Sequence, residues 1–329
     1  MDASAEVYFG EQLQERRRKL VLAASQSRGN TRILDLLQEV DTALDRINKG
    51  SFGLCETCHD PIEADRLLAD PLLRFCLDHL TDSEQRALEQ DLGLASQIQT
   101  GLLPKSNLQF SGWQVAYHYE PAGLVSGDYC DLIATQAGDL FFLLGDVSGK
   151  GVAASMLMAH LHAIFRTLIS LGLSLEEMMN RANRLFCEST TASSYATLAC
   201  GRAGRTGQIE ICNAGHCPPR LFRSGPVEHI EPTSLPLGLF CNSEFSTKSM
   251  VLYEGDVLFL FTDGLSEATS PSGQEYGENR LVALLSAHHL LPPQKLVETC
   301  WSDVATFRQG AARTDDMTVM VLKRCGESH

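Results

Sequence analysis

The chain has 329 residues, 44% of them hydrophobic, and a formal charge of -14 at pH 7. This length allows one substantial hydrophobic core and leaves room for a second module. The negative charge argues against direct nucleic-acid binding, because nucleic-acid binders gain affinity from clustered Lys and Arg side chains. The N-terminus does not read as a secretion signal and no apolar run approaches membrane-spanning length, so we expect a cytoplasmic protein with mostly reduced cysteines.

Residues 1–50 predict a helical hairpin. Apolar residues recur three or four positions apart from Ile33 to Ile47, and a polar break at residues 27–30 separates this stretch from an earlier helix. Asn30 is a candidate cap for the second helix, and Gly50 is expected to end it.

Two short cysteine motifs follow, in residues 51–80. Cys55 and Cys58 form a Cys-x-x-Cys pair, and Cys76 and His79 form a Cys-x-x-His pair further along the chain. Thiolate and imidazole ligands in two such pairs suit one tetrahedral Zn²⁺, which we predict here as a structural ion. His59 adjoins Cys58 and is either a competing ligand or a solvent-facing side chain.

The segment from Gly50-Ser-Phe-Gly-Leu-Cys to His79 resembles the zinc finger of the TraR/DksA family, in which the fourth ligand is usually cysteine. Proteins of that family are associated with RNA polymerase through a long hairpin, whereas the hairpin here is short. The resemblance therefore supports a structural zinc site better than a polymerase contact. The finger is acidic, which also disfavours direct DNA reading.

Residues 81–104 predict a linker helix. Thr81 and Glu84 have the spacing of a capping box, and Pro104 is expected to stop the helix. An apolar stripe lines one face and consists of Leu88, Leu92, Ala95, Ile98 and Leu102. This stripe suits a homodimer, docking against the following domain, or core packing within one subunit.

Residues 105–325 predict one large mixed α/β domain. Strands are expected at 140–144, 208–212, 257–261 and 317–322, and helices at 152–171 and 175–187. Four aspartates stand where an apolar run meets a turn, namely Asp128, Asp146, Asp263 and Asp315. Any one of them alone is more simply a turn residue. Together they favour two hard cations, Mg²⁺ or Mn²⁺, which can share a water and aim it at phosphorus without a covalent intermediate.

These stretches together resemble the SpoIIE/RsbU branch of the PPM metal-dependent protein phosphatases. The matching motifs include Gly-Asp-Val-Ser-Gly-Lys-Gly around Asp146, Asn-Ala-Gly-His ending at His216, Thr-Asp-Gly around Asp263 and Asp-Asp-Met-Thr starting at Asp315. The resemblance implies an α-β-β-α sandwich of two antiparallel sheets flanked by helices. It also implies that Asp146 bridges two Mn²⁺ or Mg²⁺ ions, with the Val147 carbonyl, Asp128, Asp263 and Asp315 completing the site.

The same resemblance leaves some positions open. Asp316 is an alternative to Asp315, and Asp131 is a candidate for a supporting position beside the ligands. Ser126 and Cys130 depart from the family pattern, which often has glycine and an aromatic residue at these two places. His216 is expected either to support the metal site or to be a structural histidine.

The implied activity is removal of phosphate from phosphoserine or phosphothreonine on a protein. In relatives the substrate is often a small STAS-type anti-sigma-factor antagonist in a partner-switching pathway, which makes this the expected partner by analogy. A second hypothesis is a regulatory binding protein of the transcription machinery with a non-catalytic phosphatase-like domain. Manganese-dependent hydrolysis of an aryl phosphate separates the two.

Two rival phosphate motifs are rejected. Cys217 and Arg223 have the Cys-x5-Arg spacing of cysteine-dependent phosphatases, but Pro218 and Pro219 lack the N–H donors that cradle a phosphate. The Gly149-Lys150-Gly151 turn is not a Walker loop, because no Ser or Thr follows the lysine.

Overall fold

The computed structural model describes residues 3–26, 31–63, 66–67, 70–190 and 194–326. The chain divides into two compact units, Met1–Asp91 and Leu92–His329. The boundary falls within a single helix, α4 (Asp82–Leu102).

The N-terminal unit begins with the predicted helical hairpin, formed by α1 (Ala3–Gln26) and α2 (Thr31–Asn48). Gly50 has a φ of 67°, and the Ser51 N–H donates to the Arg46 carbonyl at 2.9 Å, which closes the end of α2 as predicted. The candidate cap Asn30 lies outside the described residues.

The hairpin and the finger share one hydrophobic core. Its buried members are Phe9, Leu13, Val40, Ala43, Phe52, Cys55, Ile62, Leu67 and Cys76. The buried Arg46 of α2 donates to the carbonyls of Ser51, Leu54 and Leu73, so one side chain holds several finger segments to the helix.

A 3₁₀ helix, η1 (Leu77–His79), ends the finger and precedes α4. The Thr81 N–H donates to the Glu84 carboxylate at 2.9 Å, and the Glu84 N–H donates to Thr81 Oγ1 at 3.3 Å. This reciprocal pair is the predicted capping box at the start of α4.

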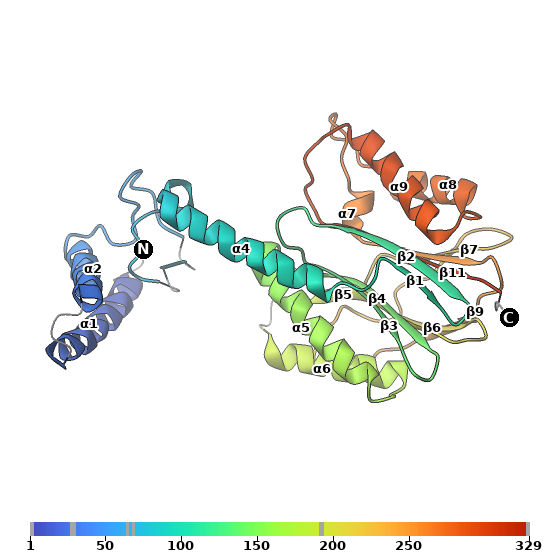
Figure 1. Ribbon diagram of the computed structural model, residues 1–329, viewed down its shortest axis with the longest axis horizontal. Helices are drawn as coiled ribbons and strands as arrows, with labels where there is room; N and C mark the ends of the chain where they lie inside the picture. Colours follow the sequence, from blue (N-terminus) through green and yellow to red (C-terminus); the bar gives the residue numbers. More distant parts are fainter. Residues whose placement is uncertain (1–2, 27–30, 64–65, 68–69, 191–193, 327–329) are drawn as a thin grey trace. The chain divides into compact units, whose positions relative to one another are not determined.

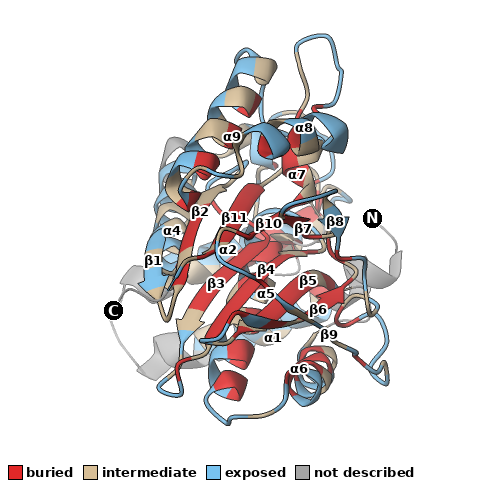
Figure 2. Ribbon diagram, turned by 90° about the vertical axis from the view of Figure 1, so that its right-hand side faces the viewer, coloured by how far each residue is buried: buried red, intermediate tan, exposed pale blue. Residues whose placement is uncertain are grey.

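The C-terminal unit contains two antiparallel sheets, with strand orders β1-β2-β11-β10-β7-β8 and β3-β4-β5-β6-β9. Most of their strands are buried, as Figure 2 shows in red. The strands of the first sheet are β1 (Asn107–Phe110), β2 (Trp113–Glu120), β7 (Arg220–Phe222), β8 (Glu228–His229), β10 (Val257–Phe261) and β11 (Met317–Arg324). Those of the second are β3 (Asp128–Ala134), β4 (Leu140–Val147), β5 (Ala196–Ala203), β6 (Gln208–Ala214) and β9 (Lys248–Val251).

Helices cover the outer faces of both sheets (Figure 1). α5 (Gly151–Ile169) and α6 (Leu175–Ser189) lie against the sheet of β3 to β6, and α8 (Glu278–His288) and α9 (Pro293–Arg308) lie against that of β2, β10 and β11. A short helix, α7 (Asp263–Ser266), follows β10. Separate buried clusters fill each of the three interlayer spaces. This order of layers is the predicted α-β-β-α sandwich.

The expected strands and helices lie within observed elements. The four strands expected at 140–144, 208–212, 257–261 and 317–322 fall in β4, β6, β10 and β11. The helices expected at 152–171 and 175–187 correspond to α5 and α6, with ends that differ by one or two residues.

α5 is long and apolar enough to cross a membrane, by length and composition alone. The expectation that no apolar run reaches this size was therefore wrong. Its Met158, Leu161 and Phe165 are buried in the cluster between the helices and the β3–β4 sheet. Packing against this sheet accounts for the apolar composition of the helix.

The apolar stripe expected on α4 is only partly buried. Within the C-terminal unit, Leu102 packs against the core, but Ile98 is 61% exposed. The fully buried side chain in this part of α4 is the polar Gln99, next to Ile98 in the sequence. The predicted stripe therefore holds at the half-buried Leu92, Ala95 and Leu102, while Gln99 is buried in place of Ile98.

Candidate metal centres

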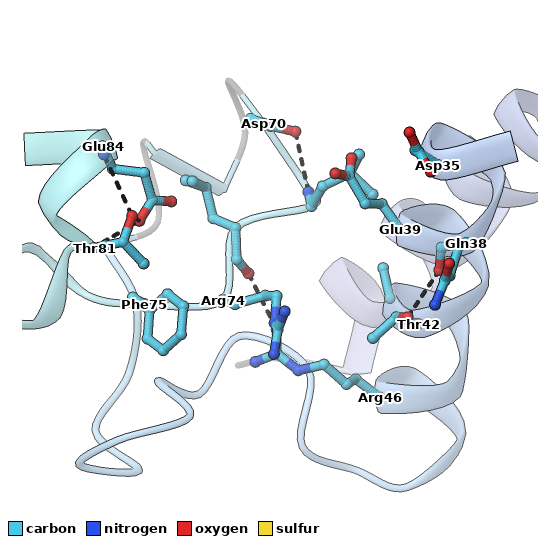
Figure 3. A pocket seen from close by; sticks show the side chains of 13 residues that line it. Asp35, Gln38, Glu39, Thr42, Arg46, Asp70, Arg74, Phe75, Thr81 and Glu84 are labelled. Atoms are coloured by element: carbon cyan, nitrogen blue, oxygen red, sulfur yellow. Dashed lines mark hydrogen bonds between the residues drawn. The ribbon is translucent and has the colours of Figure 1, made fainter. Parts of the chain in front are cut away.

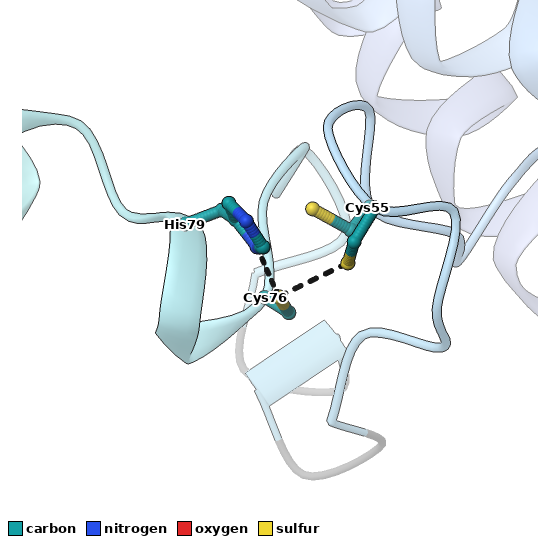
Figure 4. A group of neighbouring side chains, drawn as sticks. Cys55, Cys76 and His79 are labelled. Carbon is teal, nitrogen blue, oxygen red and sulfur yellow. Dashed lines mark hydrogen bonds between the residues drawn. The ribbon is translucent and has the colours of Figure 1, made fainter.

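The first candidate centre is the cysteine–histidine group of the N-terminal unit. Cys55, Cys58, Cys76 and His79 offer ligand atoms that all lie within 4.8 Å of one another. Cys58 Sγ is 3.7 Å from Cys76 Sγ, and Cys76 Sγ is 3.3 Å from His79 Nδ1; Figure 4 shows this grouping. A tetrahedral zinc ion with Zn–S bonds of about 2.3 Å sets its sulfur ligands about 3.8 Å apart. The predicted ligand set therefore has the separations that zinc requires.

Backbone hydrogen bonds favour the thiolate form of Cys55. Burial raises the pKa of Cys55, but the backbone N–H groups of Cys58, Cys76 and Thr57 outweigh burial and lower this pKa to about 6. The thiolate is the form that binds metal. His59 is exposed and lies outside the group. Of the two alternatives for this residue, the solvent-facing side chain is therefore the correct one.

The second candidate centre lies between the two sheets of the C-terminal unit. Asp128 begins β3, and its direct antiparallel partner on β4 is Asp146. Directly opposed residues share one face of a sheet. The alternating residues Cys130 and Leu144 on that face are buried in the cluster between the sheets. Both aspartates therefore face the first sheet, the one that contains β10 and β11.

Asp263 and Asp315 adjoin strands of that first sheet. Asp263 starts α7, two residues after β10 ends, and Asp315 stands two residues before β11 begins. β10 and β11 are antiparallel neighbours, so these two ends meet at one edge. A methyl group on Gly264 would lie 3.2 Å from Asp315 Cβ, which shows how closely the two turns pack.

Burial and neighbouring carboxylates raise the pKa values of Asp146 and Asp263. Burial raises the pKa of Asp146 to about 7, and the charges of Asp263, Asp315 and Asp316 add to the effect. Burial, and then the charge of Asp315, likewise raise the pKa of Asp263. Such repulsion between oxygen donors is relieved by bound cations. The donor set therefore fits hard divalent ions.

The spread of the carboxylates also matters. Among the described residues, only the cysteine–histidine group has its ligand atoms within 4.8 Å of one another. The four aspartates do not form such a group. In two-ion sites the metals are themselves about 3.5–4 Å apart, so their ligands are more widely separated.

Asp128 is the most deeply buried of the four, with 1% of its surface exposed. Burial, and then the charge of Asp146, raise its pKa well above the ordinary value. The hydroxyls of Thr262 and Thr318 donate to its Oδ2 at 3.0 and 2.5 Å. Sequence reasoning assigned these threonines no role, although both lie inside the motifs that contain Asp263 and Asp315.

The Val147 carbonyl lies beside Asp146. A methyl group on Gly127 would be 3.1 Å from the Val147 oxygen and 3.3 Å from Asp146 Oδ1. Both oxygens thus border the same space, which glycine keeps open. This arrangement fits the ligand role that the sequence resemblance implies for Val147.

Asp316 and Lys150 flank the four aspartates. The Asp316 carboxylate accepts the N–H groups of Ala122 and Gly127 at 2.7 and 2.8 Å, so it holds the loop before β3. The Lys150 amine donates to Asp315 Oδ2 at 3.0 Å and to the Thr314 carbonyl at 2.8 Å. Lys150 therefore brings a positive charge into contact with this cluster.

Asp131 does not support this centre, and its candidate role there was wrong. Arg166 of α5 donates to both of its carboxylate oxygens, at 2.8 and 2.6 Å. Because side chains alternate along β3, Asp131 faces α5 while Asp128 faces the other sheet. The buried Asp131 therefore joins α5 to the sheet.

Ser126, a departure from the family pattern, positions Asp128. Its Oγ accepts the Asp128 N–H at 3.0 Å. Its backbone exchanges two hydrogen bonds with the buried Gln99 side chain, at 2.7 and 2.9 Å. The end of α4 is thus joined to the first residue of β3 through Ser126. Cys130, the other departure, is simply buried between the sheets.

His216 reaches the centre indirectly. Its Nδ1 is 2.9 Å from Thr197 Oγ1, and Thr197 is the β5 partner of Asp146. Burial lowers the pKa of His216 to about 4, which keeps the ring neutral near pH 7.

Burial raises the pKa of Cys217 to about 12, and this protonated thiol supports rejecting a cysteine-dependent mechanism.

The N-terminal unit also contains a polar cavity of about 530 Å³ (Figure 3). Asp35, Glu39, Asp70 and Glu84 contribute carboxylates to its lining. Arg46 is bound to backbone carbonyls and Arg74 to Glu56. The described lining residues do not include the zinc ligands.

Comparison with known proteins assigns the family. Residues 136–325, more than half of the chain, match the family described as Stage II sporulation protein E (SpoIIE). The chain belongs to the SpoIIE family. Residues 50–84 match the prokaryotic dksA/traR C4-type zinc finger, here with His79 at the position of the fourth cysteine.

Three curated relatives cover most of the SpoIIE-like unit. Phosphoserine phosphatase RsbU of Bacillus subtilis is 23% identical and covers 73% of this chain and 72% of its own length. Phosphoserine phosphatase RsbP of Bacillus subtilis is 28% identical, over 69% of this chain and 56% of its own. Protein IcfG of Synechocystis is 25% identical, over 71% of this chain and 41% of its own length. The chain thus spans about half the length of two of these relatives.

Solved structures show the same fold. The SiaA-PP2C domain of Pseudomonas aeruginosa has a TM-score of 0.65 at 17% identity and covers 74% of this chain and 99% of its own. The RsbU and RsbW domains of Rv1364c from Mycobacterium tuberculosis have a TM-score of 0.57 at 26% identity, over 69% of this chain and 63% of their own. The C-terminal unit therefore has the fold of the SiaA-PP2C and RsbU domains.

Proposed function

We propose that this chain removes phosphate from phosphoserine or phosphothreonine on a protein, in a metal-dependent reaction. The observation that carries the proposal is the group of aspartates between the two sheets, in which burial and mutual repulsion raise the pKa values of Asp146 and Asp263. Similarity to proteins named phosphoserine phosphatase supports the choice of substrate class.

The proposed ligands of two Mn²⁺ or Mg²⁺ ions are Asp128, Asp146, the Val147 carbonyl, Asp263 and Asp315, with Asp146 shared between the ions. When bound, such ions lower the pKa of a shared water and polarise the phosphoryl group. Thr262 and Thr318 hold the Asp128 carboxylate in one orientation. Asp316 holds the adjoining loop.

Lys150 has an electrostatic role in this proposal. The five aspartates of the centre, Asp316 included, would carry one more negative charge than two divalent ions neutralise. A phosphate dianion would then meet net negative charge. The Lys150 amine, in contact with Asp315, offsets this excess and favours approach of the phosphate.

The proposed substrate is a STAS-type anti-sigma-factor antagonist in a cytoplasmic partner-switching pathway, by analogy with the RsbU-like proteins. The proposed domains are a helical hairpin (1–50), a zinc finger holding one structural Zn²⁺ (51–80), a linker helix (81–104) and the phosphatase domain (105–325). The linker helix is proposed as a possible contact between two copies of the chain. A polymerase contact is the weaker proposal, because the hairpin is short.

Hydrolysis of an aryl phosphate in Mn²⁺ tests the proposed activity. We expect the wild-type chain to be active, and Asp146→Asn to lose at least about 100-fold in kcat, more than the loss of a residue that only supports a ligand. Asp303→Asn, an aspartate paired with Arg280 on the outer helices, is the matched control and should keep its activity. A folded wild-type chain without activity in any divalent metal would favour the regulatory binding protein instead.

A further inference from the structure

Exposed apolar side chains stand on segments that connect, along the chain or through backbone hydrogen bonds, to the turn after Asp146. Val152, Met156, Tyr195, Leu239 and Phe240 are each between 40% and 68% exposed, and we call them the apolar strip. A few scattered apolar residues on a surface are ordinary, but a group of them marks an interaction site. Three different segments of the chain contribute to this strip.

The first part of the strip adjoins the residues that follow Asp146. Val152 lies in the first turn of α5, two residues after Lys150, and Met156 lies one turn further on the same face. The Tyr195 N–H donates to Ser148 Oγ at 2.9 Å, and the Ser148 N–H donates to the Tyr195 carbonyl at 2.8 Å. Tyr195 is therefore held against the turn that carries Asp146 and Lys150.

The second part of the strip is a loop fixed next to Tyr195. Leu237 exchanges two backbone hydrogen bonds with Ala196, each 2.9 Å long. The buried Asn183 of α6 accepts the Gly238 N–H at 2.8 Å and donates to the Phe240 carbonyl at 3.0 Å. The backbone of this loop is thus held firmly while Leu239 and Phe240 face outward.

We propose that the apolar strip is the docking surface for the folded phosphoprotein substrate. This rests on the proposed function, since a substrate protein must bring its phosphorylated residue to Asp146. A specific interface covers about 800 Å² on each partner, far more than one phosphoserine occupies. The substrate must therefore bind surface that adjoins the centre, and the strip is continuous with it through Ser148 and Lys150.

The composition of the strip indicates the kind of partner. Phe, Tyr and Met are enriched at the centres of protein interfaces, where aromatic anchors carry much of the binding energy. Elsewhere around the centre, the Glu267 N–H donates to the Asp263 carbonyl at 2.8 Å, so a further acidic residue lies next to Asp263. An acidic partner would be repelled there. The strip therefore fits a substrate with apolar side chains around its phosphorylated residue.

A double variant, Met156→Ser with Phe240→Ser, tests the docking surface. The control is Leu290→Ser, because Leu290 is 78% exposed and its carbonyl is bonded to Lys323, at the opposite end of β11 from Asp315. The substrates are an aryl phosphate, a folded STAS-domain protein phosphorylated on serine, and an unfolded peptide that spans the same phosphoserine.

We expect the double variant to lose at least about tenfold in kcat/KM on the folded phosphoprotein, the scale of one lost anchor. Its rate on the aryl phosphate should match wild type. Its kcat/KM on the phosphopeptide should fall less than its kcat/KM on the folded phosphoprotein. The Leu290→Ser control should match wild type on all three substrates.

An unchanged kcat/KM on the folded phosphoprotein would overturn the docking proposal, as would an equal loss on the aryl phosphate. Loss of a dimer in the double variant, with phosphoprotein turnover intact, would assign the strip to a second copy of the chain. Wild-type activity on the aryl phosphate but not on the phosphoprotein would reject docking and leave the metal chemistry standing. Inactivity on every substrate would remove the proposed function and docking together.

Discussion

Replacing Asp146 by asparagine should stabilise the C-terminal unit in the absence of Mg²⁺ and Mn²⁺. Burial, and then the charges of Asp263, Asp315 and Asp316, raise the pKa of Asp146 from 3.8 to about 7. Between these two values the folded chain holds a proton that the unfolded chain has released. The stability of the metal-free chain therefore falls as the pH rises from about 4 to 7.

The size of this change in stability follows from the pKa shift of Asp146. About three pKa units at about 1.4 kcal/mol each amount to about 4 kcal/mol of destabilisation above pH 7. Asparagine carries no charge at any of these pH values, so Asp146→Asn should recover up to this amount at pH 8. The recovery should shrink as the pH falls and disappear below about pH 3, where Asp146 is protonated in both states.

Denaturant unfolding followed by tryptophan fluorescence measures this gain. Both tryptophans of the chain, Trp113 and Trp301, lie in the C-terminal unit, so the signal reports that unit alone. The protein should be free of Mg²⁺ and Mn²⁺ but keep its zinc. Adding Mn²⁺ should stabilise wild type more than the variant, because a bound ion removes the repulsion.

Asp303→Asn is a control for which the expected change in stability has the opposite sign. A hydrogen bond from Arg280 lowers the pKa of Asp303, so this carboxylate contributes stability that is present above its unfolded pKa and lost as the pH falls. Its replacement should therefore destabilise the unit at pH 8. A gain for Asp146→Asn that is absent, or equal at pH 5 and pH 8, would refute the electrostatic account of the centre.

Three further predictions concern residues that support the two centres. Gln99→Leu should lower the free energy of unfolding by about 1–3 kcal/mol in the same fluorescence assay, because both hydrogen bonds to Ser126 are lost in a buried site; no loss would contradict the bonding. Thr318→Val should lower manganese-dependent kcat on an aryl phosphate by about 10–100-fold, whereas Thr318→Ser should keep most of the activity; equal rates would show that the hydroxyl does not position Asp128. Cys76→Ser should reduce bound zinc from about one ion per chain to near zero by elemental analysis, and wild-type protein without zinc would refute the finger.

Sequence patterns predicted most of the helices and strands, because the local preferences of these segments agree with the positions that they occupy in the fold. The apolar run at 257–261 became the fully buried β10, and Thr81 with Glu84 formed the predicted cap of α4. The two-layer sheet arrangement came from family resemblance, since periodicity carries no information on which strands pair. On α4 the predicted stripe failed at Ile98, because the polar Gln99 is buried there through hydrogen bonds that a hydrophobic pattern does not register.

The candidate site was predictable where motifs place carboxylates at strand ends. The partners of those carboxylates were not, because they depend on contacts between distant segments. Thr262 and Thr318 are 56 residues apart, yet both bind Asp128. Asp131 was misassigned because it is close to Asp128 in sequence, whereas strand alternation turns it to the opposite face, where Arg166 binds it.

Anomalous diffraction from crystals grown with Mn²⁺ tests the central claim most directly. The account predicts two manganese ions between the sheets, both bound by Asp146, with Asp128, the Val147 carbonyl, Asp263 and Asp315 as the other protein ligands. Manganese bound elsewhere, or no manganese within reach of Asp146 in folded protein, would contradict it.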